Sequence, residues 1–420
     1  MNQEREQVVV IVDGYSAGRF FVQQLIKRDY KCIHIQSVLQ PGSKFYTLQN
    51  PHDYLCLFVY CNDITQLIAD IKSKYIIINV IAGSESGVEL AHQLAQQLCL
   101  KRNADELVLE RRNKYLMVEA LRRNNLNTVE HFKTNDLDMA RSWALLHNKW
   151  PIVVKPLDSA GSDNVFICTD ISQVENAFLT IIGSQTIFDK DCHEVLLQSY
   201  LLGNEYVVNL VSCNGIHFVV ELRMYHKQNL NGRHMYDYEE LIDFTGTVQA
   251  QLIDYAKKVA DAVGIQYGPS HIEVMLTANG PVLVEIASRI SGATHVEVSN
   301  VALGYNVVDL TIDSYFDEVK FMSYLAQIAT VQKYESIVDI ATEQEGYVKQ
   351  LPSQQFISDL PSVESVRFNI NLGDYLHKTI SLVNSPAKIH LVHDVKTQIQ
   401  QDMNIIKQLF SNELKCDITA

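Results

Sequence analysis

Two glutamates, Glu273 and Glu285, each lie inside a short apolar segment of a predicted β-hairpin. The segments are residues 271–276 and 282–286, and the connection between them contains the turn-forming pair Asn279 and Gly280. Burying a carboxylate in each strand is costly unless a cation joins the two, because like charges repel and lose their hydration. A divalent metal such as Mg²⁺, which prefers oxygen ligands, would satisfy both carboxylates.

The turn decides whether the two carboxylates share a face of the hairpin. A three-residue loop at 278–280 with Gly280 left-handed places Glu273 directly opposite Glu285. A two-residue turn at Asn279 and Gly280 places the two carboxylates on opposite faces. The metal hypothesis therefore predicts the longer loop, whereas ordinary strand carboxylates facing solvent would need neither arrangement.

Composition limits the kind of protein and the kind of partner. A chain of 420 residues with 47% hydrophobic content is long enough for two to four domains. The formal net charge of -14 argues against nucleic acid or an anionic membrane as a global partner, although a local basic pocket remains compatible with it. The polar start and the short longest apolar run, near residues 75–82, predict a cytoplasmic protein without a membrane span. The eight cysteines show no C-x-x-C spacing, which is typical of reduced thiols.

The first hundred residues predict a small parallel α/β domain. Apolar runs at 8–12, 32–35 and 76–80 read as buried strands, and residues 17–28 and 88–98 read as amphipathic helices. Gly14 and Gly18 lack the third glycine of a dinucleotide-binding fingerprint, so turn chemistry explains them better.

The middle of the chain predicts a lid-like flap and a larger sheet. A charged helix at 106–123 precedes a strand at 152–156 that contains Lys155, a small-residue loop at 157–163, and a strand at 164–168. Extended segments at 195–202 and 203–211 and a helix at 248–263 lead to the hairpin. Later strands at 346–349, 363–368 and 388–392 precede a terminal helix at 395–410, which gives predicted domains at 1–110, 111–198, 199–325 and 326–420.

Five features recur in one order along residues 8–330: Lys114, Lys155, the segment from Gln198 to Glu205, Glu273, and Glu285 with Arg289. This order resembles the ATP-grasp superfamily. Three stretches, at 85–87, 111–114 and 285–292, together with the β-rich C-terminal piece, are most similar to L-amino-acid ligases of the bacilysin-synthetase type. The resemblance implies an α/β fold with an N-terminal parallel domain, a mobile lid, an antiparallel catalytic sheet and a small β-rich C-terminal subdomain.

The resemblance also implies roles for individual residues. Lys114 and Lys155 would grip the phosphates of ATP as point charges, and Glu273 and Glu285 would hold Mg²⁺, for which Mn²⁺ could substitute. Arg289 and Glu273 would be catalytic, with Arg289 holding the acyl phosphate and the tetrahedral oxyanion. The remaining ATP-binding residues implied are Ser159, Ala160, Gly161, Ser162, Gln198, Ser199, Tyr200, Leu201 and Glu205.

Two positions depart from the family pattern. Gln198 stands where family members commonly carry an acid, which puts its side-chain contact with adenine in doubt but leaves the backbone contacts. Ala287 stands where many relatives place an asparagine, so the metal would have one protein ligand fewer.

The function implied is ATP-dependent joining of two L-amino acids into a dipeptide through an acyl phosphate. The alternatives are a carboxylase or carbamoyl-phosphate-type enzyme that uses bicarbonate, a ligase acting on a carboxylate that is not an amino acid, and a nucleotide-binding scaffold without catalysis. The partners implied are ATP and small amino acids, with neither nucleic acid nor membrane, and the assembly could be a homodimer.

Substrate choice is weakly encoded in the sequence. Residues near the predicted site that could line the substrate pocket are His271, Ser291, Gly292, Ala293 and His295. An acidic run within 235–244, formed by Asp237, Glu239, Glu240 and Asp243, would favour a large or basic first amino acid if it lined the pocket. The competing interpretation is that this run is a solvated loop.

Overall fold

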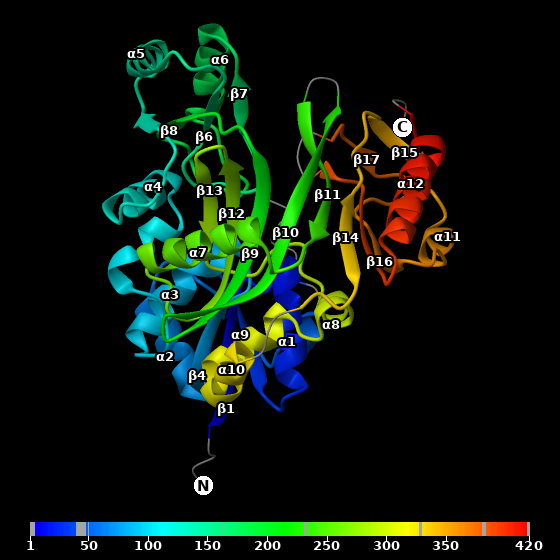
Figure 1. Ribbon diagram of the computed structural model, residues 1–420. Helices are drawn as coiled ribbons and strands as arrows, with labels where there is room; N and C mark the ends of the chain where they lie inside the picture. Colours follow the sequence, from blue (N-terminus) through cyan, green and yellow to red (C-terminus); the bar gives the residue numbers. More distant parts are fainter. Residues whose placement is uncertain are drawn as a thin grey trace.

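The structure is a computed structural model that describes residues 5–38, 48, 50–161, 163–230, 233–326, 330–379 and 384–417. Figure 1 shows the N-terminal domain at the base, a lid at the top left and the C-terminal part at the right, around a long central sheet. The described residues form a mixed α/β fold, as the sequence predicts.

The N-terminal domain is a four-stranded parallel sheet with the order β3-β2-β1-β4. Strands β1 and β2 are almost fully buried, which explains their continuous apolar sequences. Helix α1 covers one face, while α2 and α3 cover the other. The bounds are β1 Glu6–Val12, α1 Arg19–Ile26, β2 Lys31–Gln36, β3 Leu57–Val59, α2 Ile64–Lys74, β4 Tyr75–Ala82 and α3 Val88–Gln97.

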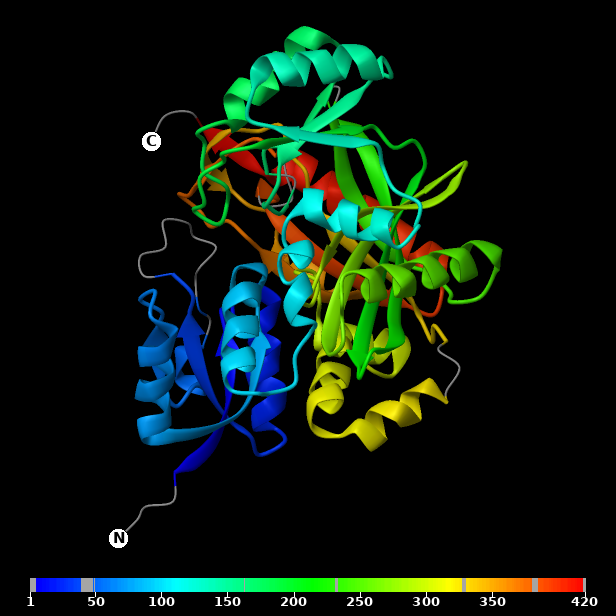
Figure 2. The same cartoon turned by 90° about the vertical axis from the view of Figure 1, so that its left-hand side faces the viewer.

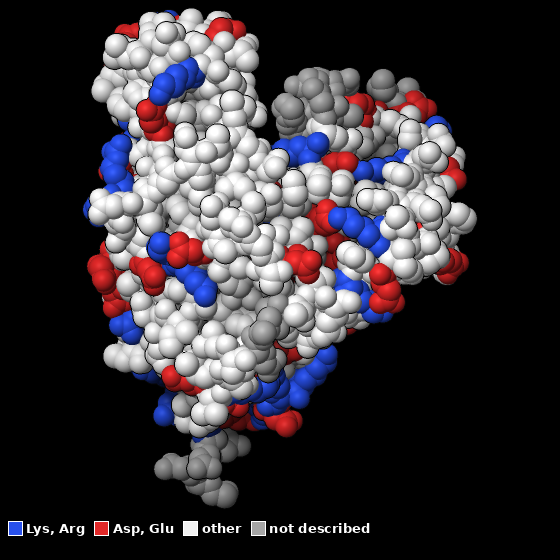
Figure 3. Space-filling model, in the orientation of Figure 1, with Lys and Arg blue, Asp and Glu red and all other residues white. Residues whose placement is uncertain are grey.

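The lid is a separate four-stranded antiparallel sheet with two helices on one side. Its strand order is β5-β8-β6-β7, and its core is built from α5, α6 and the apolar residues of β6 and β8. In Figure 3 the lid forms its own lobe, with a notch between it and the C-terminal part. The bounds are α4 Lys114–Arg123, which leads into the lid, then β5 His131–Thr134, α5 Leu137–His147, β6 Ile152–Pro156, β7 Phe166–Cys168, α6 Ile171–Ile181 and β8 Val195–Ser199.

An eight-stranded antiparallel sheet forms the centre of the molecule, with the order β13-β12-β9-β10-β11-β14-β18-β16. The predicted C-terminal strands β16 and β18 extend this sheet and do not stand apart from it. The bounds are β9 Asn204–Cys213, β10 Ile216–Leu230, β11 Arg233–Leu241, α7 Thr247–Ala262, β12 Gly268–Thr277, β13 Gly280–Ala287, α8 Val296–Leu303, α9 Val307–Phe316, α10 Glu318–Leu325, β14 Tyr334–Asp339, β16 Val363–Phe368 and β18 Ala387–His393.

The C-terminal part adds a small three-stranded sheet and the long helix α12, which packs on β14 and β18. In Figure 2 this part, drawn in orange and red, lies at the back of the view and above the N-terminal domain. The bounds are β15 Gly346–Gln350, α11 Gln354–Ser358, β17 Tyr375–Leu376, α12 Lys396–Glu413 and β19 Lys415–Asp417.

The two faces of the central sheet have different neighbours. Helix α7 packs against one face, where Ile272 and Val274 point. On the opposite face, α1 and α9 pack against Val211 and neighbouring residues, so the N-terminal domain lies on that side. Because side chains alternate along a strand, His271 and Glu273 of β12 point away from α7, toward the face on which the N-terminal domain packs.

The charged side chains on the surface and the lengths of the helices bear on possible partners. On the face shown in Figure 3, Lys and Arg side chains are interspersed with Asp and Glu. Across the described part of the chain, no helix is both long and apolar enough to cross a bilayer.

Candidate active site

The two hairpin carboxylates lie side by side, because Glu273 pairs directly with Glu285. This pairing confirms that both point to one face, but the predicted three-residue loop is wrong. Thr277 pairs with Gly280, so the connection between the strands consists of residues 278 and 279. The alternative two-residue turn at 279 and 280 is therefore wrong as well. The register shifts at Glu273, where Val284 is skipped, and this irregularity brings the carboxylates together. Gly280 has the positive φ expected for it, +99°.

Lys114 approaches the hairpin from the first turn of α4. Asn113 caps this helix by accepting hydrogen bonds from the N–H groups of the next turn, which fixes where Lys114 begins. The Lys114 Nζ lies 3.0 Å from Glu285 Oε2 and donates to the Ser159 carbonyl at 2.7 Å. Lys114 therefore links the hairpin to the small-residue loop of the lid.

Lys155 points into the same space from the lid strand β6, and only 7% of it is exposed. Burial and the nearby Lys114 lower the pKa of Lys155 to about 8, although Glu285, Glu273 and Glu205 act in the opposite direction. Burial also opposes ionisation of Glu285, but Lys114, Lys155 and Arg289 outweigh it and lower its pKa to about 2. Two lysines and three glutamates predicted to bind one nucleotide thus share one electrostatic environment.

Glu205, at the start of β9, is buried and held by two residues of neighbouring strands. Tyr236 donates to its carboxylate at 2.9 Å, and Lys227 pairs with it directly. The Lys227 ammonium also lies 4.7 Å from the centre of the Tyr236 ring. Burial raises the pKa of Glu205, and Lys227 opposes this rise. These contacts hold the Glu205 carboxyl group at the position predicted to bind the ribose hydroxyls.

The predicted adenine-binding segment bridges the lid and the central sheet. Gln198 and Ser199 are the last residues of β8, and β9 begins at Asn204, so Tyr200 and Leu201 lie in the linker between the two sheets. Leu201 packs against Val118, Val129 and Val282. A Cβ on Gly203 would lie 2.1 Å from the Leu276 carbonyl oxygen, so only glycine lets the linker cross β12 this closely.

The lid loop is ordered around Asp163 in the residues that the structure describes. Ser159 donates to Asp163 Oδ2 at 2.7 Å, and the Ile187 N–H donates to the same oxygen at 3.0 Å. Ala160 accepts from the Asp163 N–H, and Gly161 has a φ of +65°. Predicted ATP-binding residue Ser162 lies outside the described residues.

Arg289 is held by a residue from another domain. Its Nε lies 2.9 Å from Glu85 Oε2, and Glu85 follows β4 in the N-terminal domain. Arg112 pairs with the other oxygen of Glu85 and lies 2.7 Å from Asp158 of the lid loop. Glu85 therefore fixes the catalytic candidate Arg289 and couples it to the lid through Arg112.

His271 supports Glu273 from within the same strand. Its Nε2 lies 3.3 Å from Glu273 Oε1, and its Nδ1 lies 2.8 Å from Asn209 Oδ1. Asn209 in turn donates to Glu221 at 2.8 Å, and Glu221 pairs with Arg223 at 3.2 Å. Both ring nitrogens of His271, predicted to line the substrate pocket, are thus engaged by protein groups, in a geometry suited to orienting Glu273.

The other substrate-pocket candidates follow Arg289. Ser291, Gly292 and Ala293 form a short loop in which Ser291 Oγ accepts from the Ala293 N–H at 3.2 Å. His295 begins α8 and contacts two other parts of the molecule, Phe20 of α1 and His390 of β18, at ring separations of 5.4 and 5.2 Å. The loop thus runs from Arg289 to a junction of three domains.

Asp237, Glu239 and Glu240 of the acidic run lie in strand β11, which corrects the solvated-loop interpretation for these three, while Asp243 follows the strand. Asp237 pairs with Lys407 at 2.6 Å, and Glu240 pairs with Lys396, so both acids bind α12. Asp243 is exposed, and Glu239 alone among the four is buried. Two of the acids proposed to attract a basic substrate are thus paired with lysines of the C-terminal helix.

The donor set suits a magnesium ion bound with ATP. Glu273 and Glu285 offer adjacent carboxylate oxygens, while Ala287 has no ligand to offer and is buried. Among the described residues, no three His, Cys, Asp or Glu side chains are arranged to hold a metal. The remaining ligands would come from phosphate and water, which Mg²⁺ commonly retains.

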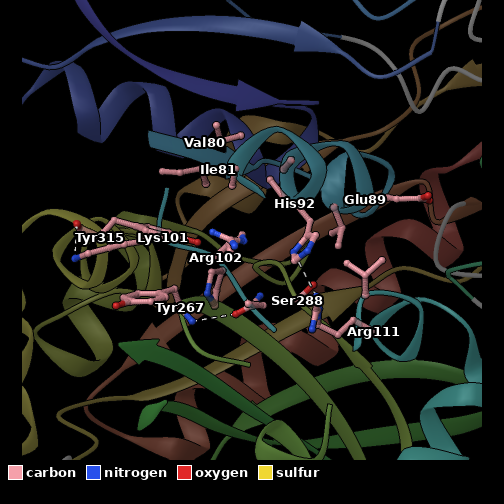
Figure 4. A pocket seen from close by; sticks show the side chains of 17 residues that line it. Val80, Ile81, Glu89, His92, Lys101, Arg102, Arg111, Tyr267, Ser288 and Tyr315 are labelled. Carbon is pink, nitrogen blue, oxygen red and sulfur yellow. Dashed lines mark hydrogen bonds between the residues drawn. The ribbon is translucent and has the colours of Figure 1, made fainter. Parts of the chain in front are cut away.

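A separate cavity of about 50 Å³ lies at the interface between the N-terminal domain and the central sheet. Figure 4 shows His92 and Glu89 of α3 above it, Lys101 and Tyr315 on one side, and Arg111 and Ser288 on another. Its cationic groups are already engaged, since Lys101 donates to the Tyr315 carbonyl at 2.9 Å and Arg111 to the Val263 carbonyl at 3.0 Å. This cavity includes none of the predicted ATP-binding residues.

Sequence reasoning did not assign roles to Glu85, Lys227 or Tyr236. Glu85 appeared only as part of a resemblance, and its partner Arg289 is far away in sequence. Lys227 and Tyr236 reach Glu205 through pairing of β9, β10 and β11, which no local spacing reveals. The signal available for Glu85 was its position after a buried parallel strand, where ligand-binding residues of α/β sheets gather.

Comparisons with known proteins agree with this geometry. Residues 148–297 match the ATP-grasp domain family. Dapdiamide A synthase of Enterobacter agglomerans is 30% identical over 411 residues, which covers 96% of each chain. The L-arginine-specific L-amino acid ligase of Bacillus subtilis is 22% identical over 268 residues, which covers 62% of each chain.

Solved structures share the fold. The L-amino acid ligase from Bacillus licheniformis has a TM-score of 0.78 at 15% identity, covering 97% of this chain and 98% of that one. Phosphoribosylglycinamide synthetase from Anaerococcus prevotii has a TM-score of 0.68 at 13% identity, covering 99% of this chain and all of that one.

Proposed function

The chain belongs to the ATP-grasp superfamily, and we propose that it is an ATP-dependent ligase that joins two L-amino acids into a dipeptide. The products would be the dipeptide, ADP and phosphate, with an acyl phosphate as intermediate. The observation that carries the proposal is the position of Arg289. It follows the paired carboxylates closely in the chain, and an ion pair with Glu85 holds its guanidinium group. The similarity to two amino acid ligases supports the same substrate class.

The lysines and carboxylates serve phosphoryl transfer. Lys114 and Lys155 approach from α4 and from the lid, so they can hold a triphosphate from two sides. Glu273 and Glu285 would hold Mg²⁺, which supplies neutralisation of the phosphate charge. Glu205 would accept hydrogen bonds from the ribose, in exchange for those it now receives from Lys227 and Tyr236.

Arg289 serves the second half of the reaction. A guanidinium donates to two oxygens at once, so it can hold the acyl phosphate and then the oxyanion formed when the amine attacks. Its link to the lid through Glu85 and Arg112 would couple lid position to the placement of this donor. Exclusion of water by the lid matters here because an acyl phosphate hydrolyses readily.

The test is an ADP-release assay over pairs of amino acids, with dipeptides identified by mass spectrometry. We expect ADP release that depends on both members of a pair and a dipeptide of the matching mass. Absence of both for every pair would contradict the proposal. Bicarbonate-stimulated ATP hydrolysis without amino acids would instead favour a carboxylase.

Three further expectations accompany this function. Mn²⁺ should replace Mg²⁺ in supporting turnover. The protein should act in the cytoplasm, where ATP is available, and it should assemble as a homodimer. Light scattering on a sizing column measures the assembly directly.

A further inference from the structure

A row of polar residues crosses the face of the central sheet that carries the paired carboxylates. Directly paired residues of antiparallel strands point to the same face, and His271, Asn209 and Glu221 are paired in this way. Farther along, Glu239, Ile337 and His390 are paired in register, and so are Asp339, Lys388 and Arg367. The row therefore runs from the metal-binding candidates to the outermost strand, β16.

Most charges in this row are paired with each other. Arg223 lies 2.8 Å from Glu335 and also binds Glu221, and Lys388 lies 2.7 Å from Asp339. Glu239 is buried, and burial raises its pKa, while Lys388 and Arg223 oppose the rise. Arg367, at the end of the row, forms no ion pair with any carboxylate that the structure describes, and its Nε is buried without a hydrogen-bond partner.

A second guanidinium reaches this end of the row from the N-terminal domain. Arg19 lies 4.3 Å above the ring of Phe20, and Phe20 contacts His295, which contacts His390. Arg19 donates to the Ser16 carbonyl at 2.7 Å and makes no ion pair with a described carboxylate. Arg19, His295, Arg367 and His390 form what we call the junction cluster.

The two guanidinium groups of the junction cluster make no ion pair with a described carboxylate, although the charge of Glu297 acts on Arg19 and that of Asp339 acts on Arg367. Burial and the charge of Arg367 lower the pKa of Arg19, and burial also lowers that of Arg367. The carboxylate whose charge reaches Arg19 is Glu297, which is 56% exposed and lies 3.4 Å from His295. Partly buried guanidinium groups near each other are costly unless an anion joins them.

The junction cluster adjoins the reaction centre through two connections. A Cβ on Gly18 would lie 2.3 Å from the Gly83 carbonyl, so Arg19 and Glu85 come from turns that touch at one edge of the parallel sheet. Glu85 holds Arg289, and the loop 291–293 joins Arg289 to His295. An acyl substrate whose carboxylate lay at Arg289 could therefore extend along this loop toward Arg19 and Arg367.

We propose that the junction cluster binds a second carboxylate, at the far end of the amino acid whose α-carboxylate is activated. The acyl donor would then be an acidic amino acid or an amino acid bearing an acidic side-chain substituent. The inference rests on the proposed function, and it reverses the preference for a basic donor that the acidic run suggested. A forked guanidinium suits a carboxylate because it donates two parallel hydrogen bonds.

Binding is measured by calorimetry with Mg²⁺ and ADP present, comparing L-glutamate with its neutral isostere L-glutamine. We expect glutamate to bind about tenfold more tightly or better, and this difference to disappear in Arg367→Gln and Arg19→Gln. Arg367→Lys should retain part of it because the charge remains. Arg122→Gln, at a largely exposed position on α4, is the matched control and should bind both ligands as the parent does.

Equal or tighter binding of glutamine or arginine by the parent protein would overturn the inference, as would an unchanged preference in both arginine variants. Thermal melting of each variant separates a lost contact from a lost fold, and an Arg367→Gln protein that melts like the parent but keeps its preference counts against the site. If glutamate binds as expected but no pair of amino acids yields a dipeptide, the proposed function fails and the carboxylate site stands.

Discussion

Lys155, a candidate phosphate-binding residue, changes its charge near pH 8. Burial and Lys114 lower its pKa from 10.5 to about 8, so above pH 8 the free protein progressively loses one of the two charges proposed to bind phosphate. We expect the KM for ATP to rise about tenfold per pH unit above pH 8. Lys155→Arg, which keeps its charge, should show a much flatter dependence between pH 7 and 9.5.

The same shift has a consequence for folding. The unfolded chain holds the Lys155 proton more tightly than the folded one, so the buried charge opposes folding below pH 8. This cost declines as pH rises from about 8 toward 10.5.

If Lys155→Arg and the parent showed the same pH dependence of the KM for ATP, the assignment of Lys155 to the phosphates would be wrong.

His271 tests whether Glu273 must be held in place to bind metal. Removing the ring in His271→Ala leaves Glu273 without its neighbour and leaves Asn209 without one of its contacts. We expect the Mg²⁺ concentration for half-maximal activity to rise about 10- to 100-fold, with partial recovery at high Mg²⁺. His193→Ala, at an exposed position, is the control. An unchanged Mg²⁺ dependence in His271→Ala would show that Glu273 needs no such support.

Single residues could be predicted from sequence where their chemistry conflicts with their surroundings. Lys155 in an apolar strand and two glutamates in an apolar hairpin each require a partner of opposite charge. In the structure the charges of the two glutamates act on Lys155, and Lys114 pairs with Glu285. Glu85 and Lys227 create no such local conflict, because their partners come from other domains or strands. Their roles therefore emerge only once the chain is folded.

At the scale of elements, the hairpin shows how a correct register can follow from a wrong turn. The sequence signal for a glycine turn was real, since Gly280 has a positive φ, but pairing starts at Gly280 itself. The irregularity near Val284 then restores the register of the carboxylates. Bulges of this kind depend on cross-strand packing with β9 and carry little sequence signature.

The predicted helix at 106–123 illustrates the opposite situation. Two short 3₁₀ turns, at Asp105–Leu107 and Leu109–Arg111, precede α4, which starts only at Lys114. Asn113 could have indicated this boundary, since asparagine is a strong N-cap. The helix propensity of the charged residues before it masked that signal.

The linker between β8 and β9 supplies a prediction about nucleotide binding. In Gly203→Ala the new methyl group would meet the Leu276 carbonyl at 2.1 Å, so the linker must shift away from β12. We expect the KM for ATP to rise about tenfold and stability to fall by about 1–3 kcal/mol. Calorimetric ATP binding and thermal melting measure the two effects.

Gly280→Ala is the control for backbone strain at this hairpin. No atom lies within 4 Å of its added Cβ, but the φ of +99° disfavours alanine. It should cost about 1 kcal/mol and leave the KM for ATP unchanged. A Gly203→Ala protein that binds ATP as well as Gly280→Ala does would exclude the linker from the adenine site.

At the scale of the whole molecule, the N-terminal domain contributes a residue to the proposed reaction centre. Glu85 of that domain pairs with Arg289 and Arg112, which belong to other parts of the chain. We expect Glu85→Gln to lower kcat about 10- to 100-fold while leaving the KM for ATP nearly unchanged, because Arg289 acts after phosphate binding. Steady-state kinetics measure this separation.

Glu89→Gln, one helical turn farther along and about 44% exposed, should behave like the parent. A rise in the KM for ATP in Glu85→Gln without loss of kcat would instead place Glu85 at the nucleotide.

The general architecture was predictable because alternating strands and helices identify the N-terminal domain. The joining of β14, β16 and β18 to the central sheet was not, since it depends on pairing between distant segments.

The most direct test of an acyl-phosphate ligase follows the oxygen atoms of the activated amino acid. In the proposed reaction a carboxylate oxygen attacks the γ-phosphorus and displaces ADP. The amine then attacks the acyl carbon and displaces phosphate, so that oxygen leaves with the phosphate. With an acyl donor labelled by ¹⁸O in its carboxylate, we predict one ¹⁸O atom in the phosphate released and one in the dipeptide carbonyl, by mass spectrometry. Unlabelled phosphate formed together with dipeptide would contradict an acyl-phosphate intermediate.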